Sequence, residues 1–245
     1  AQAIYPHFYD IGNPLDLYES VDGELDRVLN KTLWLLNQFN FSGINRDVLG
    51  KLYEKYLPKD ERKQLGEFYT PDEVVDYILD AVEYSPSKAI ENKGLIDPAC
   101  GSGGFLVRAT RRLIARYAVK FEKATPKEAL DPKKWSGVLD KLTPKECEEI
   151  VCGVAEHIHG FDVNPFAASI TEMNLLFQVI DIYSKAAQSN RSFTVPRFEI
   201  YRADSLELPS SQKDLHGFAS PFGNSLAKDH AAVEALKLSK YDFVV

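Results

Sequence analysis

Long apolar segments are missing from this sequence of 245 residues. No apolar run approaches the roughly 20 residues that a membrane-spanning helix requires. Residues 1–10 are aromatic and polar, without the basic stretch and apolar run of a secretory signal peptide. Hydrophobic residues still make up 44% of the chain, which excludes an intrinsically disordered protein because a core can be buried. We therefore expect a folded cytoplasmic protein of one or two domains, with no membrane partner.

Cysteine and positive charge are also scarce. The only cysteines are Cys100, Cys147 and Cys152, an odd number, and the last two lack His or Cys neighbours at metal-ligand spacing. We therefore expect reduced thiols. We expect neither a disulfide framework nor a metal site. The 29 Lys and Arg against 36 Asp and Glu give a net charge of -7. A module that binds DNA by itself is usually basic, so contacts with DNA phosphates should come mainly from another domain or partner.

The character of the sequence changes near residue 66. Before it, apolar residues recur at helical spacing; after it, short apolar runs typical of strands alternate with long amphipathic segments. We divide the chain into an N-terminal helical segment, residues 1–65, and an α/β domain, residues 66–245. Within the domain, residues 122–143 are rich in Lys and Glu and predict an exposed insertion. Strands that alternate with helices predict a parallel, doubly wound sheet. The expected strands are residues 94–96, 158–163, 198–204 and 241–245.

Three of these strands end in, or next to, an aspartate: Asp97, Asp162 and Asp204. In a doubly wound sheet the ligand lies at the carboxyl ends of the strands, so the three carboxylates would meet at one edge. A carboxylate after the second strand can accept hydrogen bonds from both ribose hydroxyls, and one after the third can accept from an exocyclic amine of adenine. Asp162 or Asp204 alone is more typical of a strand-end turn, but their joint placement with Asp97 favours a nucleoside site.

A glycine-rich turn, residues 97–104, follows the first expected strand. Gly101 and Gly103 would let the backbone approach a ligand without interference from Cβ atoms. A dinucleotide site would need a third glycine, and Leu106 stands at that position. The Asp97 carboxylate would also repel a pyrophosphate. A cationic ligand fits better, and S-adenosylmethionine carries a sulfonium and an ammonium group.

The pattern Thr-Pro-x-Glu occurs at Thr70, Thr125 and Thr143. It predicts a helix that begins with a capping box. For the helix after Thr70, the expected buried stripe consists of Val74, Val75, Ile78, Leu79 and Val82.

Four arginines would share one face of the helix that follows the glycine turn: Arg108, Arg111, Arg112 and Arg116. We interpret them as a solvated face in preference to a contact with DNA or a partner.

Together the motifs resemble those of the adenine-N6 DNA methyltransferases, a family that includes modification subunits of type I restriction systems and fused restriction–modification enzymes. In chain order they are residues 66–71 (Gly-Glu-Phe-Tyr-Thr-Pro), 97–106, 160–165 and 203–206, and residues 47–56 resemble the family's helical lead-in. The resemblance implies the Rossmann-like fold of class I S-adenosylmethionine-dependent methyltransferases, with the fourth strand beside the first, incomplete at the C-terminus. It implies methylation of adenine N6 in DNA, as part of a restriction–modification or related defence system.

The resemblance also assigns roles to residues. Asp162 would hold the ribose and Asp204 the adenine N6, while Thr70 and the turn at 101–104 would hold the methionine end. Val163 and Pro165 would sandwich the adenine ring. The full set of expected S-adenosylmethionine-binding residues is Phe68, Tyr69, Thr70, Asp97, Ala99, Gly101, Ser102, Gly103, Gly104, Asp162, Val163, Asn164, Asp204 and Leu206.

The family's catalytic motif, Asn or Asp followed by Pro-Pro and an aromatic residue, does not occur in the sequence. In the family it comes directly after the strand matched by residues 241–245, so we expect it just after Val245. This chain would then supply the cofactor-binding half and be inactive alone. The expected partners are DNA, contacted mainly through other regions, and specificity or restriction subunits or fused domains. Two alternatives stay open: a methyltransferase that acts on RNA or a protein glutamine, and a non-catalytic module that binds the cofactor or a partner.

Overall fold

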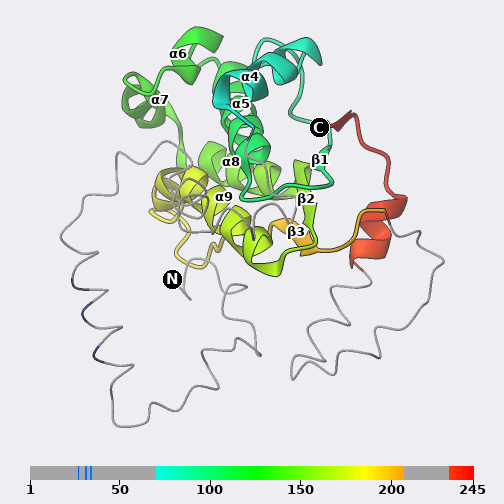
Figure 1. Ribbon diagram of the computed structural model, residues 1–245. Coiled ribbons are helices and arrows are strands. Elements are labelled where there is room, and N and C mark those ends of the chain that lie inside the picture. Colours follow the sequence, from blue (N-terminus) through cyan, green and yellow to red (C-terminus); the bar gives the residue numbers. More distant parts are fainter. Residues whose placement is uncertain (1–26, 28–30, 32–33, 35–69, 207–231) are drawn as a thin grey trace.

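The computed structural model describes residues 70–206 and 232–245, together with residues 27, 31 and 34 (Figure 1). The expected helical lead-in at residues 47–56, and the motif residues Phe68 and Tyr69, lie outside the described residues. The division at residue 65 therefore stays a prediction.

Four parallel strands form the sheet in the order β3-β2-β1-β4. They are β1 (Leu95–Asp97), β2 (Ile158–Asp162), β3 (Glu199–Arg202) and β4 (Phe243–Val244). In register, Asp97 of β1 lies beside Gly160 of β2, and Leu95 lies beside Phe243 of β4. The fourth strand thus lies beside the first, which confirms both the parallel sheet and the expected strand order. Because parallel neighbours need a crossover, helices return the chain between them.

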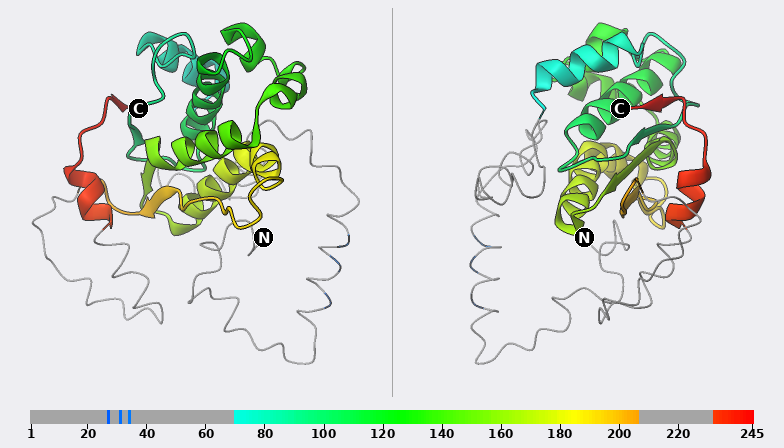
Figure 2. Two further views of the ribbon diagram at one scale, coloured as in Figure 1. Left: turned by 180° about the vertical axis from the view of Figure 1, so that it is seen from behind. Right: turned by 45° about the vertical axis from the view of Figure 1, so that its right-hand side comes forward.

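Three long helices cover one face of the sheet: α5 (Gly104–Lys120), α8 (Pro144–His157) and α9 (Pro165–Ala186). Side chains alternate along each strand between the two faces, as the period of two requires. Leu95, Ile158 and Ile200 join the helices' core cluster. On the opposite face, Ile96, Phe161 and Tyr201 pack with Val233. Val233 belongs to a helical segment at residues 232–238, which Figure 2 shows across the sheet from α9.

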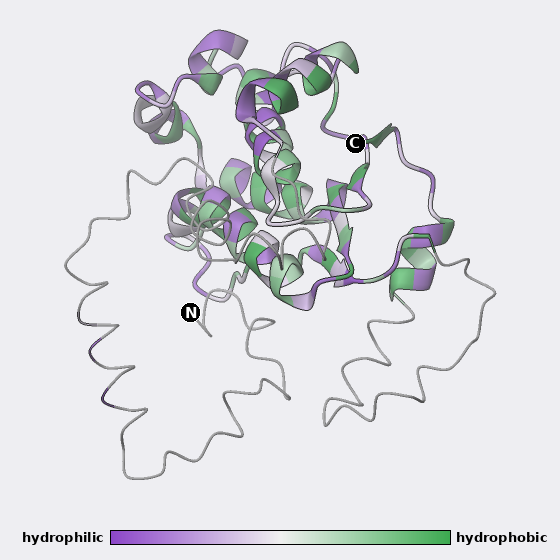
Figure 3. Cartoon of the chain, in the orientation of Figure 1, coloured by the Kyte–Doolittle hydropathy of each residue, from purple (hydrophilic) through white to green (hydrophobic). Residues whose placement is uncertain are grey.

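Residues 122–143 are not simply an exposed insertion, so that expectation is wrong in part. They form two short helices, α6 (Pro126–Leu130) and α7 (Trp135–Lys141), in which hydrophilic and hydrophobic residues alternate (Figure 3). Ala129 and Val138, however, are buried in one cluster with alanines of α5. Lys185 of α9 also donates hydrogen bonds of 2.7 and 2.8 Å to the carbonyls of Leu139 and Asp140. These contacts attach the segment to the domain core, because the ammonium satisfies carbonyls at the end of α7.

The helix after Thr70 begins one residue later than the capping-box pattern predicts. In α4 (Asp72–Ala81) the N-cap is Pro71, and no side chain caps the helix, so the expected Thr70 capping box is wrong. The same pattern does form complete capping boxes at Thr125 and Thr143. At Pro71 the ψ angle of 143° is extended, which places Thr70 outside capping range of the first turn.

The buried stripe of α4 is narrower than expected. Of the five predicted residues only Val75 and Leu79 are buried, while Val74 and Val82 are exposed. The adjoining row of α4 carries the acidic residues Asp72, Asp76 and Asp80, which face α5. Apolar burial alone therefore contributes less to the attachment of α4 than the sequence suggests.

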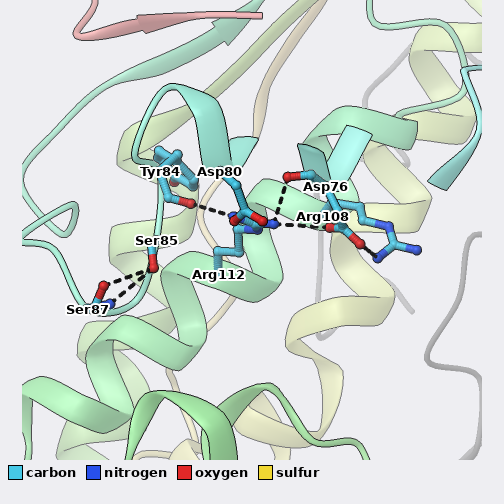
Figure 4. A network of polar contacts seen from close by, with 7 residues as sticks. All are labelled: Asp76, Asp80, Tyr84, Ser85, Ser87, Arg108 and Arg112. Atoms are coloured by element: carbon cyan, nitrogen blue, oxygen red, sulfur yellow. Dashed lines mark hydrogen bonds and ion pairs between the residues drawn. The ribbon is translucent and has the colours of Figure 1, made fainter. Parts of the chain in front are cut away.

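Three of the four arginines of α5 pair with acidic groups of the same chain and the fourth binds a glutamine, so the expected solvated face is wrong. Arg108 forms ion pairs with Asp72, at 2.8 Å, and with Asp76. Arg112, with only 9% of its side chain exposed, pairs with Asp76 and Asp80. It also donates to the carbonyl of Tyr84 at 3.0 Å (Figure 4).

The remaining two arginines reach other elements. Arg116 donates two hydrogen bonds, of 2.6 and 2.9 Å, to the carboxylate of Glu91, and this pairing holds the pKa of Glu91 below its usual range. Arg111 donates to the side-chain oxygen of Gln178 on α9 at 2.9 Å. Acidic residues of α4 and of the loop after it thus pair with arginines of α5, and the paired residues repeat every four positions along each helix. We call the pairs of Arg108 and Arg112 with Asp72, Asp76 and Asp80 the arginine ladder.

Replacement of Arg112 by Gln should lower the free energy of unfolding by about 2–4 kcal/mol, because a buried guanidinium is lost from two carboxylates and two carbonyls. The measurement is urea unfolding at neutral pH. Lys88→Gln is the matched control, since the Lys88–Glu83 pair is exposed and such pairs contribute about 0–1 kcal/mol. Equal losses in the two variants would contradict a stabilising role for the ladder.

Candidate cofactor-binding site

The carboxyl ends of β1, β2 and β3 bring the three expected aspartates to one edge of the sheet. Asp97 is the last residue of β1 and Asp162 the last residue of β2; they are 5% and 9% exposed. Asp204 follows β3 by two residues and is exposed. The edge therefore combines two buried carboxylates with one that is open to solvent.

Both carboxylate oxygens of Asp162 accept hydrogen bonds from backbone. Oδ2 accepts from the N–H of Gly101, in the turn after β1, and Oδ1 accepts from the N–H of Asn164, both at 2.8 Å. A carboxylate has about four lone-pair positions, so acceptor capacity remains for hydroxyl groups of a ligand. Asp162 thus fixes two turns while keeping the chemistry that binding a ribose requires.

Asp97 lies at the buried end of the site, where its Oδ1 accepts from the N–H of Ala99 at 3.0 Å. Burial raises the pKa of the Asp97 carboxyl to about 7; the Ala99 hydrogen bond opposes the shift, and the nearby Asp162 charge adds to it. A proton is therefore held there near neutral pH. A cation bound at this edge would favour the ionised form.

Asp204 has a turn-forming role of its own, because its Oδ1 accepts from the N–H of Leu206 at 2.9 Å. The turn-forming interpretation of Asp162 and Asp204 agrees with these hydrogen bonds, Asp97 forms a similar turn with Ala99, and the binding of a ligand by the three stays a prediction. The two roles are compatible, since each turn occupies only part of a carboxylate.

The glycine turn between β1 and α5 has the left-handed backbone that glycine allows. The φ angles are +54° at Gly101 and +93° at Gly103. A Cβ atom added at Gly101 would meet nothing within 4 Å, so the turn is open there. At Gly103 it would come within 3.0 Å of the Thr171 side chain. Gly101 is therefore needed for backbone conformation, and Gly103 also for close packing on α9.

Two residues of the site were missed by sequence reasoning: Thr171 and Asn174 on α9. The Thr171 hydroxyl donates to the carbonyl of Gly101 at 2.8 Å, and the Asn174 amide donates to the carbonyl of Ser102 at 2.9 Å. Both side chains are buried, at 0% and 2% exposed. The available signal was the presence of two polar residues three positions apart on the buried face of an apolar helix.

Large apolar side chains stand exposed beside the aspartates. Val163, directly after Asp162, is 55% exposed, and Leu206 is 89% exposed. The side chain of Asn164 is occupied in part, since it accepts from the N–H of Phe166 at 2.9 Å and caps α9. Apolar surface of the kind expected to contact an adenine ring is thus exposed next to Asp162 and Asp204.

The arginine ladder fixes the beginning of α4, two residues after Thr70, against α5. The pair between Asp72, in the first turn of α4, and Arg108 ties the beginning of α4 to the second turn of α5. Because α5 begins at the glycine turn, this pair links the beginning of α4 to the helix that follows that turn, and the role of Thr70 stays a prediction.

The described residues show neither a reactive cysteine nor a metal-binding cluster. All three cysteines are free, and burial raises the pKa of the Cys100 thiol, so it stays protonated and poorly nucleophilic. Among the described residues, no cluster of three or more His, Cys, Asp or Glu could hold a metal ion. In the same part of the chain, no helix has the length and apolarity needed to cross a membrane.

Asp97→Asn should change how stability depends on pH. A carboxyl whose pKa is about 7 when folded and about 4 when unfolded stabilises the fold fully below pH 4, and this contribution is lost as the pH rises through 7. Asparagine can keep the Ala99 hydrogen bond without ionising. The variant should therefore gain stability relative to the parent, on the order of 3 kcal/mol between pH 4 and pH 8.

The measurement is chemical unfolding of both proteins across that pH range. His159 titrates in the same window, because burial lowers its pKa to about 4, but it is present in both proteins and cancels in the difference. A pH-independent difference would show that Asp97 is already ionised in the folded protein.

Comparison with known proteins places this site in a family. The model of the N-6 DNA methylase family matches residues 44–214, which includes the glycine turn and all three aspartates. The chain is 28% identical over 153 residues to a type I restriction enzyme MjaIX methylase subunit from Methanocaldococcus jannaschii, covering 59% of this chain and 20% of that protein. It is 31% identical over 130 residues to the adenine-specific methyltransferase PglX of Streptomyces coelicolor, covering 52% of this chain and 9% of that one.

A third relative is the type I restriction enzyme EcoEI methylase subunit of Escherichia coli, 28% identical over 141 residues, covering 57% of this chain and 25% of the relative. The chain thus spans a quarter or less of the length of each of these three proteins. The family match covers well over half of the chain, and the parallel sheet, strand order and glycine turn agree with it. This chain belongs to the adenine-N6 DNA methyltransferase family and has the Rossmann-like α/β fold of class I S-adenosylmethionine-dependent methyltransferases.

Proposed function

We propose that this domain binds S-adenosylmethionine at the carboxyl edge of its sheet. It would form the cofactor-binding part of a methyltransferase that modifies adenine N6 in DNA, in a restriction–modification or related defence system. The observation that carries the proposal is the pair of buried carboxylates, Asp97 and Asp162, beside a glycine turn that is open at Gly101. Two relatives are named as methylase subunits of type I restriction enzymes and one as an adenine-specific methyltransferase, which supports the substrate and the setting.

Different residues of this edge contact different parts of the cofactor. Asp162 accepts from the ribose hydroxyls with its remaining lone pairs, and Asp204, which is exposed, accepts from the adenine N6 amine. Val163 and Leu206 supply apolar surface for the adenine ring. Asn164 supports this part of the site by capping α9, and Pro165 packs on the ring's other face.

The methionine end lies toward the glycine turn. Asp97 and Ala99 border it, and the ionised Asp97 complements the positive charge of the ligand. No side chain caps α5 at Gly103, so the N–H groups of its first turn, which begins at Gly104, remain available for a carboxylate. Phe68, Tyr69 and Thr70 would complete this end of the site, as the resemblance of residues 66–71 to the family motif implies. The cofactor itself supplies the methyl group.

The net charge of the chain, and the small part of its relatives that it spans, indicate that other regions or subunits hold the DNA. With a net charge of -7 the chain itself offers little attraction for phosphates, so DNA is held mainly by other regions. Specificity or restriction subunits, or fused domains, would provide them, in the cytoplasm. From the apolar spacing of the sequence we propose an N-terminal helical segment, residues 1–65, before the cofactor-binding part, residues 66–245, in which residues 122–143 are an insertion.

Calorimetric titration with S-adenosylmethionine tests the cofactor site. Asp162→Asn should weaken binding by about 10- to 150-fold, since charge-assisted hydrogen bonds of about 1.5–3 kcal/mol are lost. Asp181→Asn, which removes an exposed carboxylate from α9, is the matched control and should bind like the parent. Unchanged affinity in Asp162→Asn would remove the ribose assignment, and a parent protein that does not bind the cofactor would overturn the proposal.

Transfer of labelled methyl groups tests the reaction. The full protein should label unmethylated DNA and yield N6-methyladenine on hydrolysis. The 245-residue chain alone should give only background, because the Asn-Pro-Pro-aromatic motif that positions the target amine in the family does not occur in it. Label recovered in RNA or in methylglutamine, with none in DNA, would replace the DNA substrate by that alternative. Cofactor binding with no transfer to any of them would identify a binding module.

A further inference from the structure

Helix α9 holds the glycine turn from below with two buried polar side chains. The Thr171 hydroxyl donates to the carbonyl of Gly101, and the Asn174 amide donates to the carbonyl of Ser102, at 2.8 and 2.9 Å. Burying a hydroxyl and an amide in a helix that packs on the core is costly unless each finds a partner. Their partners are two consecutive carbonyls of the turn, so the pair acts on one short piece of backbone. We call Thr171 and Asn174 the α9 clamp.

The clamp determines which way the turn's N–H groups point. In a trans peptide the C=O and the following N–H point in opposite directions, and the described residues contain no cis peptide. Because the Gly101 carbonyl points to Thr171, the Ser102 N–H points away from α9.

The neighbouring amides of the turn are already used inside the protein. Gly101 donates to Asp162 and Gly103 donates to the carbonyl of Cys100, both at 2.8 Å. The Ser102 N–H has no acceptor among the described residues. One donor of the turn is thus directed outward beside the uncapped first turn of α5.

We propose that Thr171 and Asn174 are positioning residues, which hold the glycine turn so that the Ser102 N–H donates to an anionic group of the ligand. This inference rests on the proposed function, under which that group is the carboxylate of S-adenosylmethionine. Gly103 belongs to the same device, since any larger residue would push against Thr171 and separate the turn from α9. The clamp touches the turn and leaves the reacting methyl group to other residues.

The wild-type protein provides the first test, by amide hydrogen exchange with and without S-adenosylmethionine. Binding should protect the Ser102 amide. The Gly101 and Gly103 amides, which are already bonded inside the protein, should change little. A Ser102 amide that the bound cofactor does not protect would overturn the inference, whether or not any variant folds.

Variants of the full protein, the form expected to transfer methyl groups, provide the second test. Thr171→Val removes the hydroxyl at nearly constant shape, Asn174→Leu removes the amide, and Thr171→Ser restores a hydroxyl. Ser184→Ala is the matched control, because Ser184 lies on the same helix but donates only to the carbonyl of Ile180 within it.

Thr171→Val and Asn174→Leu should each weaken cofactor binding, and raise KM for the cofactor, by about tenfold or more, because a buried carbonyl of the turn loses its donor and the turn relaxes. Thr171→Ser and Ser184→Ala should bind like the parent. At saturating cofactor kcat should stay within about twofold, which a general loss of structure would not allow.

Binding by Thr171→Val and Asn174→Leu that equals the parent would overturn the clamp while leaving the proposed function intact. A parent that binds no S-adenosylmethionine would instead refute the proposed function. In that case exchange in the ligand-free proteins still reports on the clamp: the amides of residues 101–103 should exchange faster in Thr171→Val than in Thr171→Ser.

Discussion

The edge of the sheet depends on the hydrogen bonds that converge on Asp162. Its side chain accepts from Gly101, after β1, and from Asn164, after β2, while its backbone carbonyl accepts from Ala203, after β3. One residue therefore connects the turns that follow three neighbouring strands. Its position at the end of β2, between β1 and β3, makes this possible, because only a central strand lies beside both neighbours. The three turns consequently form one surface, and displacement of Asp162 would release all of them.

At the same edge of the sheet, the burial of two carboxylates lowers the stability of the folded protein, and folding alone does not explain why they are there. Two carboxylates are buried near each other, and one of them, Asp97, has its pKa raised by burial to about 7. The clamp of Thr171 and Asn174 adds buried polar groups next to them. Groups of this kind are kept in a protein where a ligand compensates for them. A cation at Asp97 and hydroxyls at Asp162 would do so, which links the unfavourable features of the free protein to binding.

Much of the fold could be predicted from the sequence because its signals are local. The strands are short apolar runs, two aspartates end a strand and the third lies two residues after one, and the capping boxes at Thr125 and Thr143 involve residues three apart. The misses involve partners far along the chain. The arginines of α5 appear solvated until residues 72–80 are placed beside them, and the clamp appears only when α9 lies under the turn. At Thr70 the local signal itself was misleading, because the N-cap is Pro71 and the helix begins only at Asp72.

The spacing of the arginine ladder leaves an ambiguity that charge cannot resolve. Acids at 72, 76 and 80 and arginines at 108 and 112 repeat with the same period, so sliding α4 by one helical turn, roughly 6 Å, would still pair opposite charges. Uncharged groups choose between these registers: the Tyr84 carbonyl that Arg112 binds, and the buried side chains of Val75 and Leu79. The ion pairs hold α4 against α5, whereas these neutral contacts set the position of α4 along the axis of α5. A shift of α4 by a fraction of a turn would separate the opposite charges, whereas a shift by a whole turn would pair them again.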